Sequence, residues 1–221
     1  DVETGEPAYM TAYMCEQFCM NHPGFQEAYQ SYLKRLLPET GIDGLMSDDA
    51  IYYPGWRACG CSWCRKRFRD DYGRDLPPTS DVSFWGNRDS DAWKDWIAMR
   101  YNTVRGFMGV TQRALPEGFP LMVCCSSSDG QHMPAVAMTY QDFVEHSNIV
   151  LLEMCASTPT LEGRWGDRVQ SQLLHTGIAR DHGVPCFGLG YGFFPDTAFF
   201  VWAVNKFLGS DCWFSTLKMR L

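Results

Sequence analysis

Short apolar runs alternate with amphipathic helical patterns along almost the whole chain. The apolar runs have the length and composition of strands, and they lie at residues 8–14, 42–47, 119–125, 148–155, 184–189 and 210–215. The helical patterns lie at about 23–40, 91–115, 140–145, 167–181 and 196–208. This alternation is typical of parallel βα units. Because a closed (β/α)8 barrel requires eight strands, the sequence predicts an α/β fold, a partial TIM barrel with six of eight βα units and the first two missing.

Length and charge limit the class of protein further. With 221 residues and 45% hydrophobic content, residues 1–221 can form the C-terminal portion of a single barrel catalytic domain. The net charge of −7 argues against nucleic acid or an anionic membrane as partner, since both require a basic surface. No apolar run approaches the length of a membrane span. Several of the ten cysteines lie inside apolar runs, which favours a reducing, cytoplasmic location. Association into a homo-oligomer stays open.

Carboxylates follow two of the predicted strands. The run 42–47 leads directly into Asp48 and Asp49, and Glu153 is the single acid in the apolar run 148–155. Barrel enzymes hold their catalytic groups at the carboxyl ends of the strands, and burial of an unpaired carboxylate without a role would be costly. Asp48 and Glu153 are therefore the first catalytic candidates. Asp49 is the alternative to Asp48, although it can instead cap the following loop, and Glu153 can instead pair with an arginine such as Arg164.

A cysteine-rich loop at residues 50–80 contains the run Cys59-Gly-Cys61-Ser-Trp-Cys64. This spacing is typical of a metal site, and four thiolates make a closed, structural zinc site. We expect an upstream cysteine to complete the set, Cys15 before Cys19. The alternative is a group of free or oxidised thiols. No organic cofactor is expected, because the glycines near residue 190 lack the helix that a dinucleotide-binding motif requires.

Other side chains at or beyond the predicted strand ends could bind a carbohydrate substrate. They supply hydroxyl or imidazole groups for sugar hydroxyls, or aromatic rings for the walls of a sugar pocket. The candidates are Tyr52, Ser126, His132, Trp165, Tyr191 and Trp213.

The motifs resemble two groups of glycosidases over roughly residues 15–100. The cysteine motif, with Asn21-x-Pro23 before it and Phe68-Arg69-x-x-Tyr72-Gly73 after it, resembles the family 42 glycoside hydrolases, β-galactosidase-like barrels with a zinc held by cysteines. The run 43–48, Asp-Gly-Leu-Met-Ser-Asp, is similar to a motif on the fourth barrel strand of the hypothetical glycosyl hydrolases allied to the α-L-fucosidases.

The two resemblances differ in what they imply for catalysis. Family 42 enzymes place an Asn-Glu pair on the fourth barrel strand and a catalytic Glu on the seventh. This chain has Asp48-Asp49 after the presumed fourth strand and no acid in the presumed seventh, 184–191, so that active site does not transfer. The fucosidase-like resemblance implies that Asp48 is the nucleophile.

The expected function is therefore that of a retaining glycoside hydrolase acting on an oligo- or polysaccharide. Asp48 would be the nucleophile and Glu153 the acid/base, with the two carboxyl groups about 5–5.5 Å apart, against roughly 6.5–9.5 Å for an inverting enzyme. Two alternatives remain. One is a metal-dependent hydrolase acting through Asp48, Asp49 and His132, and the other is a non-catalytic sugar-binding barrel.

Overall fold

The computed structural model describes residues 1–11, 14–48, 50–52, 55–126, 132–154, 165–190 and 195–214. The chain divides into two compact units. The helical unit consists of Asp1–Gly41, Ala50–Pro116 and His132–Thr139. The sheet unit consists of Ile42–Asp49, Glu117–Gln131 and Tyr140–Leu221. None of the described helices is long and apolar enough to cross a membrane.

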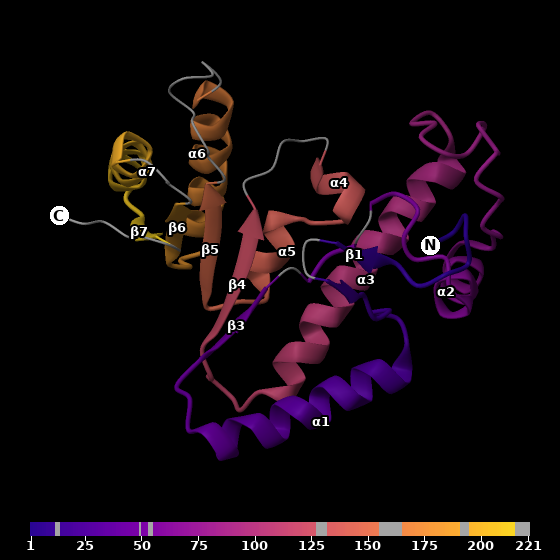
Figure 1. Ribbon diagram of the computed structural model, residues 1–221, viewed down its shortest axis with the longest axis horizontal. Helices are drawn as coiled ribbons and strands as arrows, with labels where there is room; N and C mark the ends of the chain where they lie inside the picture. The colour runs from indigo at the N-terminus through magenta and orange to yellow at the C-terminus, as the bar shows by residue number, and fades with distance from the viewer. Residues whose placement is uncertain are drawn as a thin grey trace. The chain divides into compact units, whose positions relative to one another are not determined.

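The sheet unit is built on one parallel sheet whose five strands follow one another in chain order (Figure 1). The strands are β3 (Leu45–Ser47), β4 (Leu121–Ser126), β5 (Ile149–Met154), β6 (Cys186–Gly190) and β7 (Asp211–Phe214). Five of the six predicted strand runs thus form a parallel sheet in the predicted order. The sheet is open in the described part of the chain, with β3 and β7 at its edges.

The first predicted strand, 8–14, does not join this sheet, so that prediction is wrong. In the helical unit, β1 (Tyr9–Met10) pairs antiparallel with β2 (Cys15–Glu16). The chain turns directly after β1, where the Met14 N–H donates to the Thr11 carbonyl at 3.3 Å. Tyr9 is 58% exposed. The apolar composition of this predicted strand therefore did not indicate a buried strand.

Three helices of the sheet unit cover one face of the sheet. They are α5 (Tyr140–Glu145), α6 (Trp165–Asp181) and α7 (Pro195–Leu208), close to their predicted positions. From α7, the Asn205 amide contacts the Cys212 sulfur at 3.9 Å. A Cβ added to Gly188 would lie 2.0 Å from Asn205 Oδ1, so only glycine allows this close approach of helix and strand. Cys212 and Gly188 are register partners and belong to the helix-covered face.

The opposite face of the sheet carries a small apolar cluster. Cys124, Leu151 and Leu189 are buried together, with Met122 and Phe187 packed against them. Because strand residues alternate between faces, this cluster is on the side of the sheet away from α5, α6 and α7. We call it the helix-free face, in the sense that it is opposite to α5, α6 and α7 of the same unit.

The helical unit contains α1 (Pro23–Thr40), α2 (Ser62–Tyr72), α3 (Asp91–Ala114) and α4 (His132–Val136). The helix α1 ends at Gly41 as predicted, in the left-handed conformation with φ 63°. Its N-cap is His22, not Asn21, and the His22 ring accepts from the Phe25 N–H at 3.2 Å. Pro23 occupies the first helical position, which makes the residue directly before it the cap. The helix α2 was not predicted, because its residues were interpreted as part of the cysteine-rich loop.

The core of the helical unit is aromatic and joins α2 to α3. Phe68 of α2 and Trp96 of α3 are fully buried with their ring centroids 5.5 Å apart, and Trp93 packs in the same cluster. The Trp96 indole donates to the Trp56 carbonyl at 3.1 Å. This cluster stabilises the segment that leads into the cysteines.

Arg100 of α3 binds the same segment from inside. Its guanidinium is fully buried and donates to the carbonyls of Gly55 (2.7 Å), Ala58 (2.9 Å), Pro134 (3.2 Å) and Ala135 (2.6 Å). A planar group with five fixed donors suits several carbonyl acceptors at once. Arg100 therefore holds the backbone that immediately precedes Cys59.

Candidate functional site

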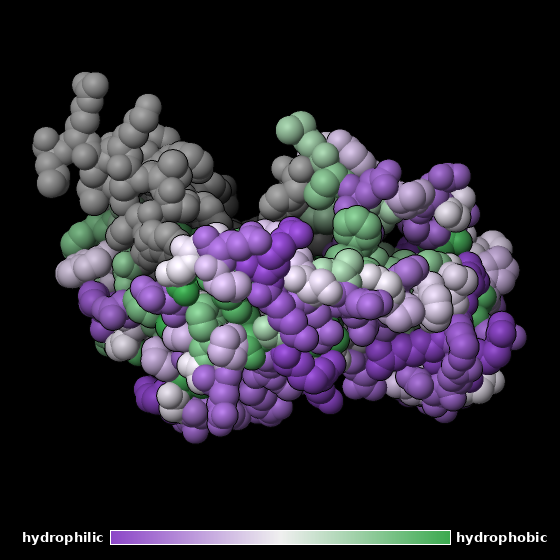
Figure 2. Space-filling view, turned by 90° about the horizontal axis from the view of Figure 1, so that it is seen from below, coloured by the Kyte–Doolittle hydropathy of each residue, from purple (hydrophilic) through white to green (hydrophobic). Residues whose placement is uncertain are grey.

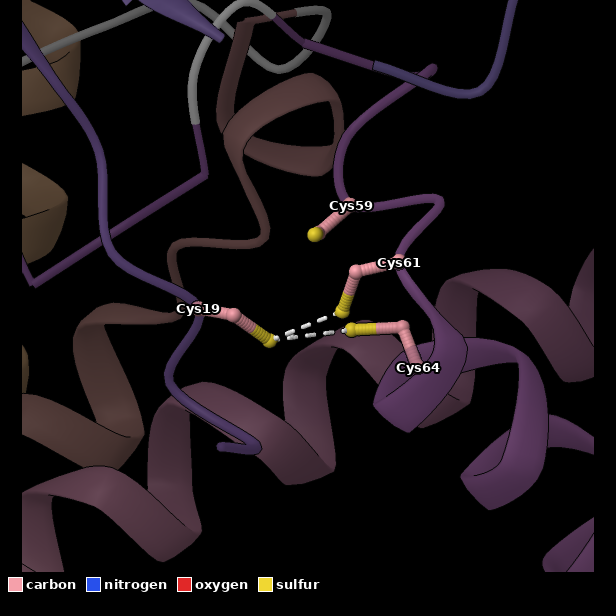
Figure 3. Close-up of side chains that lie close together, drawn as sticks. All are labelled: Cys19, Cys59, Cys61 and Cys64. Carbon is pink, nitrogen blue, oxygen red and sulfur yellow. Dashed lines mark hydrogen bonds between the residues drawn. The ribbon is translucent and has the colours of Figure 1, made fainter. Parts of the chain in front are cut away.

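Four cysteine sulfurs gather at one point of the helical unit, where they face one another (Figure 3). The Sγ atoms of Cys19, Cys59, Cys61 and Cys64 all lie within 4.8 Å of one another. Cys19 Sγ is 3.4 Å from both Cys61 Sγ and Cys64 Sγ. Ligand sulfurs at the Zn–S distance of a tetrahedral site would be about 3.8 Å apart. The described cysteines therefore fit a tetrahedral metal ion without rearrangement of the backbone.

The local backbone explains how these sulfurs meet. Cys61 is the N-cap of α2 and Cys64 is in its first turn, so both lie at the positive end of the helix dipole, which favours thiolates. Cys19 precedes α1. Cys15 is exposed in β2 and is not part of the cluster, so the preference for Cys15 over Cys19 is corrected. Cys15 is exposed because β2 belongs to an exposed two-stranded ribbon.

The four thiols cannot all lose their protons together without a cation. Hydrogen bonds, the strongest from Cys19, lower the pKa of Cys61 and lower that of Cys59 to about 7. Hydrogen bonds with the other three cysteines, together with burial, raise the pKa of Cys64. Two of the sulfurs can thus be thiolates while the others keep protons. A bound divalent cation removes this conflict, because metal binding releases the remaining protons.

Glu153 lies at the carboxyl end of β5 in the sheet unit. Its register partners are Ser126 on β4 and Leu189 on β6. It comes two residues after Leu151, so by strand alternation it belongs to the helix-free face. The side chain is half-buried. Glu153 therefore does not belong to the face covered by α5, α6 and α7.

Asp48 is exposed and directly follows β3, two strands away from β5. Ser47 pairs with Val123, whereas Glu153 pairs with Ser126 on the same strand β4. Counted along β4, the register position of Asp48 is therefore two residues before that of Glu153. Two strand spacings separate their backbones by roughly 10 Å across the sheet. Whether their carboxyl groups meet stays a prediction.

The remaining predicted residues have different outcomes. Tyr52 is only 2% exposed, with the Arg100 guanidinium 4.8 Å above its ring, so it packs in the helical unit instead of forming an open wall for a sugar. Asp49 and Tyr191 lie outside the described residues. The backbone is described but the side chain is not at Ser126, His132, Trp165 and Trp213.

Two groups around the cysteines were missed by sequence reasoning. Arg100 was hidden within an amphipathic helix pattern, where a single buried cation leaves no periodic signal. The other is Asn21, whose amide lies 3.2 Å from Cys64 Sγ. The proline at position 23 was the available signal, because it makes His22 the cap and leaves Asn21 without that role.

Comparisons with known proteins bear on the fold. No protein-family model matches the chain, and no curated protein matches it. Its structure is similar to the PgaB (BpsB) glycoside hydrolase domain from Bordetella bronchiseptica, with a TM-score of 0.61, 12% identity, and coverage of 91% of this chain and 59% of that one. It is also similar to the catalytic domain of beta-amylase from Paenibacillus polymyxa, with a TM-score of 0.53, 15% identity, and coverage of 86% and 61%.

The chain thus spans about three fifths of the length of each of these solved domains. At such low identity the likeness concerns the fold alone. Together with the parallel sheet in chain order, it shows that this chain has a mixed α/β fold similar to that of glycoside hydrolase catalytic domains.

Proposed function

We propose that this chain forms part of the catalytic domain of a glycoside hydrolase, with its parallel sheet as part of a (β/α)8 barrel. The observation that carries the proposal is the position of Glu153. It is a half-buried acid on the helix-free face, at the carboxyl end of a strand, in a fold similar to that of known glycosidase domains. In a barrel this is the face that surrounds the axis, and this end of the strands carries the active site.

Asp48 is the proposed partner of Glu153. In the first step, the Glu153 carboxylic acid gives its proton to the glycosidic oxygen while the Asp48 carboxylate attacks the anomeric carbon, so that the glycosidic bond breaks and the rest of the saccharide leaves as an alcohol. In the second, Glu153 takes a proton from water, which displaces Asp48 from the sugar. A retaining mechanism of this kind needs the carboxyl groups about 5–5.5 Å apart. Since β3 and β5 are separated by β4, both side chains would have to lean toward each other over the end of β4.

The substrate class is an oligo- or polysaccharide. Hydroxyl, imidazole and aromatic side chains would bind it, and Ser126 is the first candidate because it is the register partner of Glu153. The other proposed contacts are His132, Trp165, Tyr191 and Trp213. Asp49 is the alternative nucleophile if Asp48 faces solvent.

We further propose that Cys19, Cys59, Cys61 and Cys64 hold one structural zinc. The all-sulfur donor set supports zinc over harder cations, and a site filled by four protein ligands has no open position for substrate. When bound, zinc would link the segment before α1 to the loop before α2. The proposed compartment is a reducing one such as the cytoplasm, because Cys124 and Cys125 are buried in the sheet unit as small apolar side chains.

The test is turnover of a panel of chromogenic glycosides by the intact protein and by its Glu153→Gln and Asp48→Asn variants. Loss of acid/base catalysis costs about 100- to 10,000-fold in rate, so we expect each variant to fall by at least 100-fold on a substrate that the wild type cleaves. The loss of turnover in Glu153→Gln should be smallest on glycosides whose leaving group departs without protonation. Sugar binding without turnover in the wild type would instead support a non-catalytic sugar-binding barrel.

A further inference from the structure

The side chain of Asn21 is fixed by a polar network that reaches Cys64. Its Oδ1 accepts from Arg67 Nη1 of α2 at 2.7 Å. Its Nδ2 lies 3.1 Å from Thr103 Oγ1 of α3 and 3.2 Å from Cys64 Sγ. Asn21 thus joins two helices and one of the four clustered cysteines.

The donors and acceptors of this network leave one consistent arrangement. Arginine only donates, so the oxygen of the Asn21 amide must face Arg67 and the NH2 group must face Thr103 and Cys64. The Thr103 hydroxyl donates its own proton to the Met99 carbonyl at 2.9 Å, and so accepts from Asn21. One amide proton therefore goes to Thr103, and the other goes to the Cys64 sulfur. Cys64 is an acceptor in this arrangement.

An acceptor sulfur is what a metal-bound thiolate provides. A thiol can donate and accept weakly, whereas a thiolate only accepts and carries charge that an N–H donor stabilises. Partners of this kind, which hydrogen-bond to a ligand instead of to the metal, orient the ligand and tune its affinity. Cys64 is the fully buried member of the four, so water does not supply such a donor there.

We propose that Asn21 is a positioning residue for the metal centre. It donates an N–H···S hydrogen bond to Cys64 and thereby raises the affinity of the four cysteines for zinc. This proposal rests on the zinc site proposed above. Asn21 is available for this role because His22, not Asn21, caps α1. Arg67 keeps the amide oriented, and its own guanidinium is held by an ion pair from Nε to Asp71 at 3.1 Å.

The experiment measures zinc affinity in the intact protein, by competition with a chromogenic chelator, for the wild type and for Asn21→Asp. Aspartate has nearly the same shape and can still accept from Arg67, but it offers no donor to Cys64. We expect a 10- to 100-fold loss of zinc affinity, the usual cost of removing such a partner. Cobalt substitution gives a second readout, because the sulfur-to-cobalt charge-transfer band of the variant should shift relative to that of the wild type.

The matched control is Asn87→Asp. It makes the same change in the turn before α3, where Asn87 donates to the Ser83 carbonyl at 2.9 Å and takes no part in the cluster. Its zinc affinity should equal that of the wild type. Asn21→Ala adds no charge and should lose affinity in the same direction as Asn21→Asp, so a folding defect of one variant does not decide the result.

The outcomes are distinguishable. A wild type that binds no zinc overturns the metal site itself. Wild-type zinc affinity and an unchanged cobalt spectrum in both Asn21 variants overturn only the role of Asn21. A merely structural role would lower the stability of the metal-free and zinc-loaded forms equally and leave the zinc affinity unchanged.

Discussion

The two units use cysteine in opposite ways. In the helical unit, four sulfurs lie within 4.8 Å of one another beside polar donors. In the sheet unit, Cys124 and Cys125 are neighbours in sequence, yet strand alternation sends them to opposite faces, where both are buried. The comparison teaches that local backbone decides the role. In a loop that enters a helix, cysteine sulfurs can lie close together around one point. In a strand, neighbouring cysteines belong to opposite faces, and each packs as a small apolar side chain.

The visible surface is mainly polar. Figure 2 shows a face covered mainly by hydrophilic residues, with smaller apolar patches between them. This is ordinary for a chain with a net charge of −7.

The largest expected effect separates the two kinds of cysteine. Cys64→Ser removes one of four zinc ligands, and zinc contributes roughly 10–16 kcal/mol in small four-ligand sites. We expect at least a 100-fold loss of zinc affinity, measured by chelator competition, and loss of most of the stabilisation by added zinc. Cys125→Ser should leave zinc affinity unchanged and cost about 1–3 kcal/mol of unfolding free energy, because it buries a hydroxyl. Equal zinc affinity in both variants would remove the distinction between the units.

Arg100→Met tests how far the helical unit depends on its buried cation. The substitution leaves the carbonyls of Ala58 and Ala135 without the Arg100 donor, whereas the carbonyls of Gly55 and Pro134 still accept from the backbone N–H groups of Ala58 and Ala137. Each buried unsatisfied group costs about 1–3 kcal/mol, so we expect a loss of about 2–6 kcal/mol in the free energy of unfolding, measured with denaturant. Burial lowers the pKa of Arg100 to about 10, so the guanidinium stays charged at neutral pH. Lys94→Met on the same helix removes an exposed ion pair with Asp91 and a long, exposed hydrogen bond to the Asp89 carbonyl, and should stay within about 0.5 kcal/mol.

Acid should weaken the sheet unit through His175. Its ring stacks on Tyr140 with centroids 4.5 Å apart, and its Nδ1 has no hydrogen-bond partner among the described residues. Burial lowers the pKa of His175 to about 4, against an unfolded value of about 6.5. Because the unfolded chain binds the extra proton first, stability is fully present above pH 6.5 and falls as the pH drops toward 4, by about 3 kcal/mol.

The measurement is the free energy of unfolding as a function of pH. His175→Leu should flatten the curve between pH 6.5 and 4, while His182→Gln, at an exposed histidine, should leave its slope unchanged. A slope that survives in His175→Leu would mean that other groups cause the acid sensitivity.

The smallest effect compares one glycine from each unit. Gly188→Ala places a methyl group 2.0 Å from Asn205 Oδ1, and Asn205 is held by hydrogen bonds to Val201 and Gln172. We expect a loss of about 1–3 kcal/mol, the usual cost of overpacking. Gly106→Ala in α3 meets nothing within 4 Å and should gain about 0.5–1 kcal/mol from better helix propensity. Thermal unfolding of the two variants should therefore shift in opposite directions.

The sequence by itself determined most of the secondary structure. Periodicity located α1, α3 and five strands to within a few residues, and α1 and α7 end directly before glycines at 41 and 209. The cysteine spacing indicated a metal site, and three of its residues lie in the cluster. These features are local, because a cap, a turn or a short ligand motif depends on residues that are near one another in the chain.

Only the tertiary structure decided what depends on distant contacts. It showed that Cys19, not Cys15, lies beside the loop cysteines. It also showed that β1 pairs with β2 instead of joining the parallel sheet. It also showed that Arg100 is a buried clamp and that Asn21 is a donor to Cys64. The physical reason is that burial, hydrogen-bond pairing and strand register arise between residues far apart in sequence. A periodic sequence pattern does not indicate which of two similar side chains will contact a distant partner.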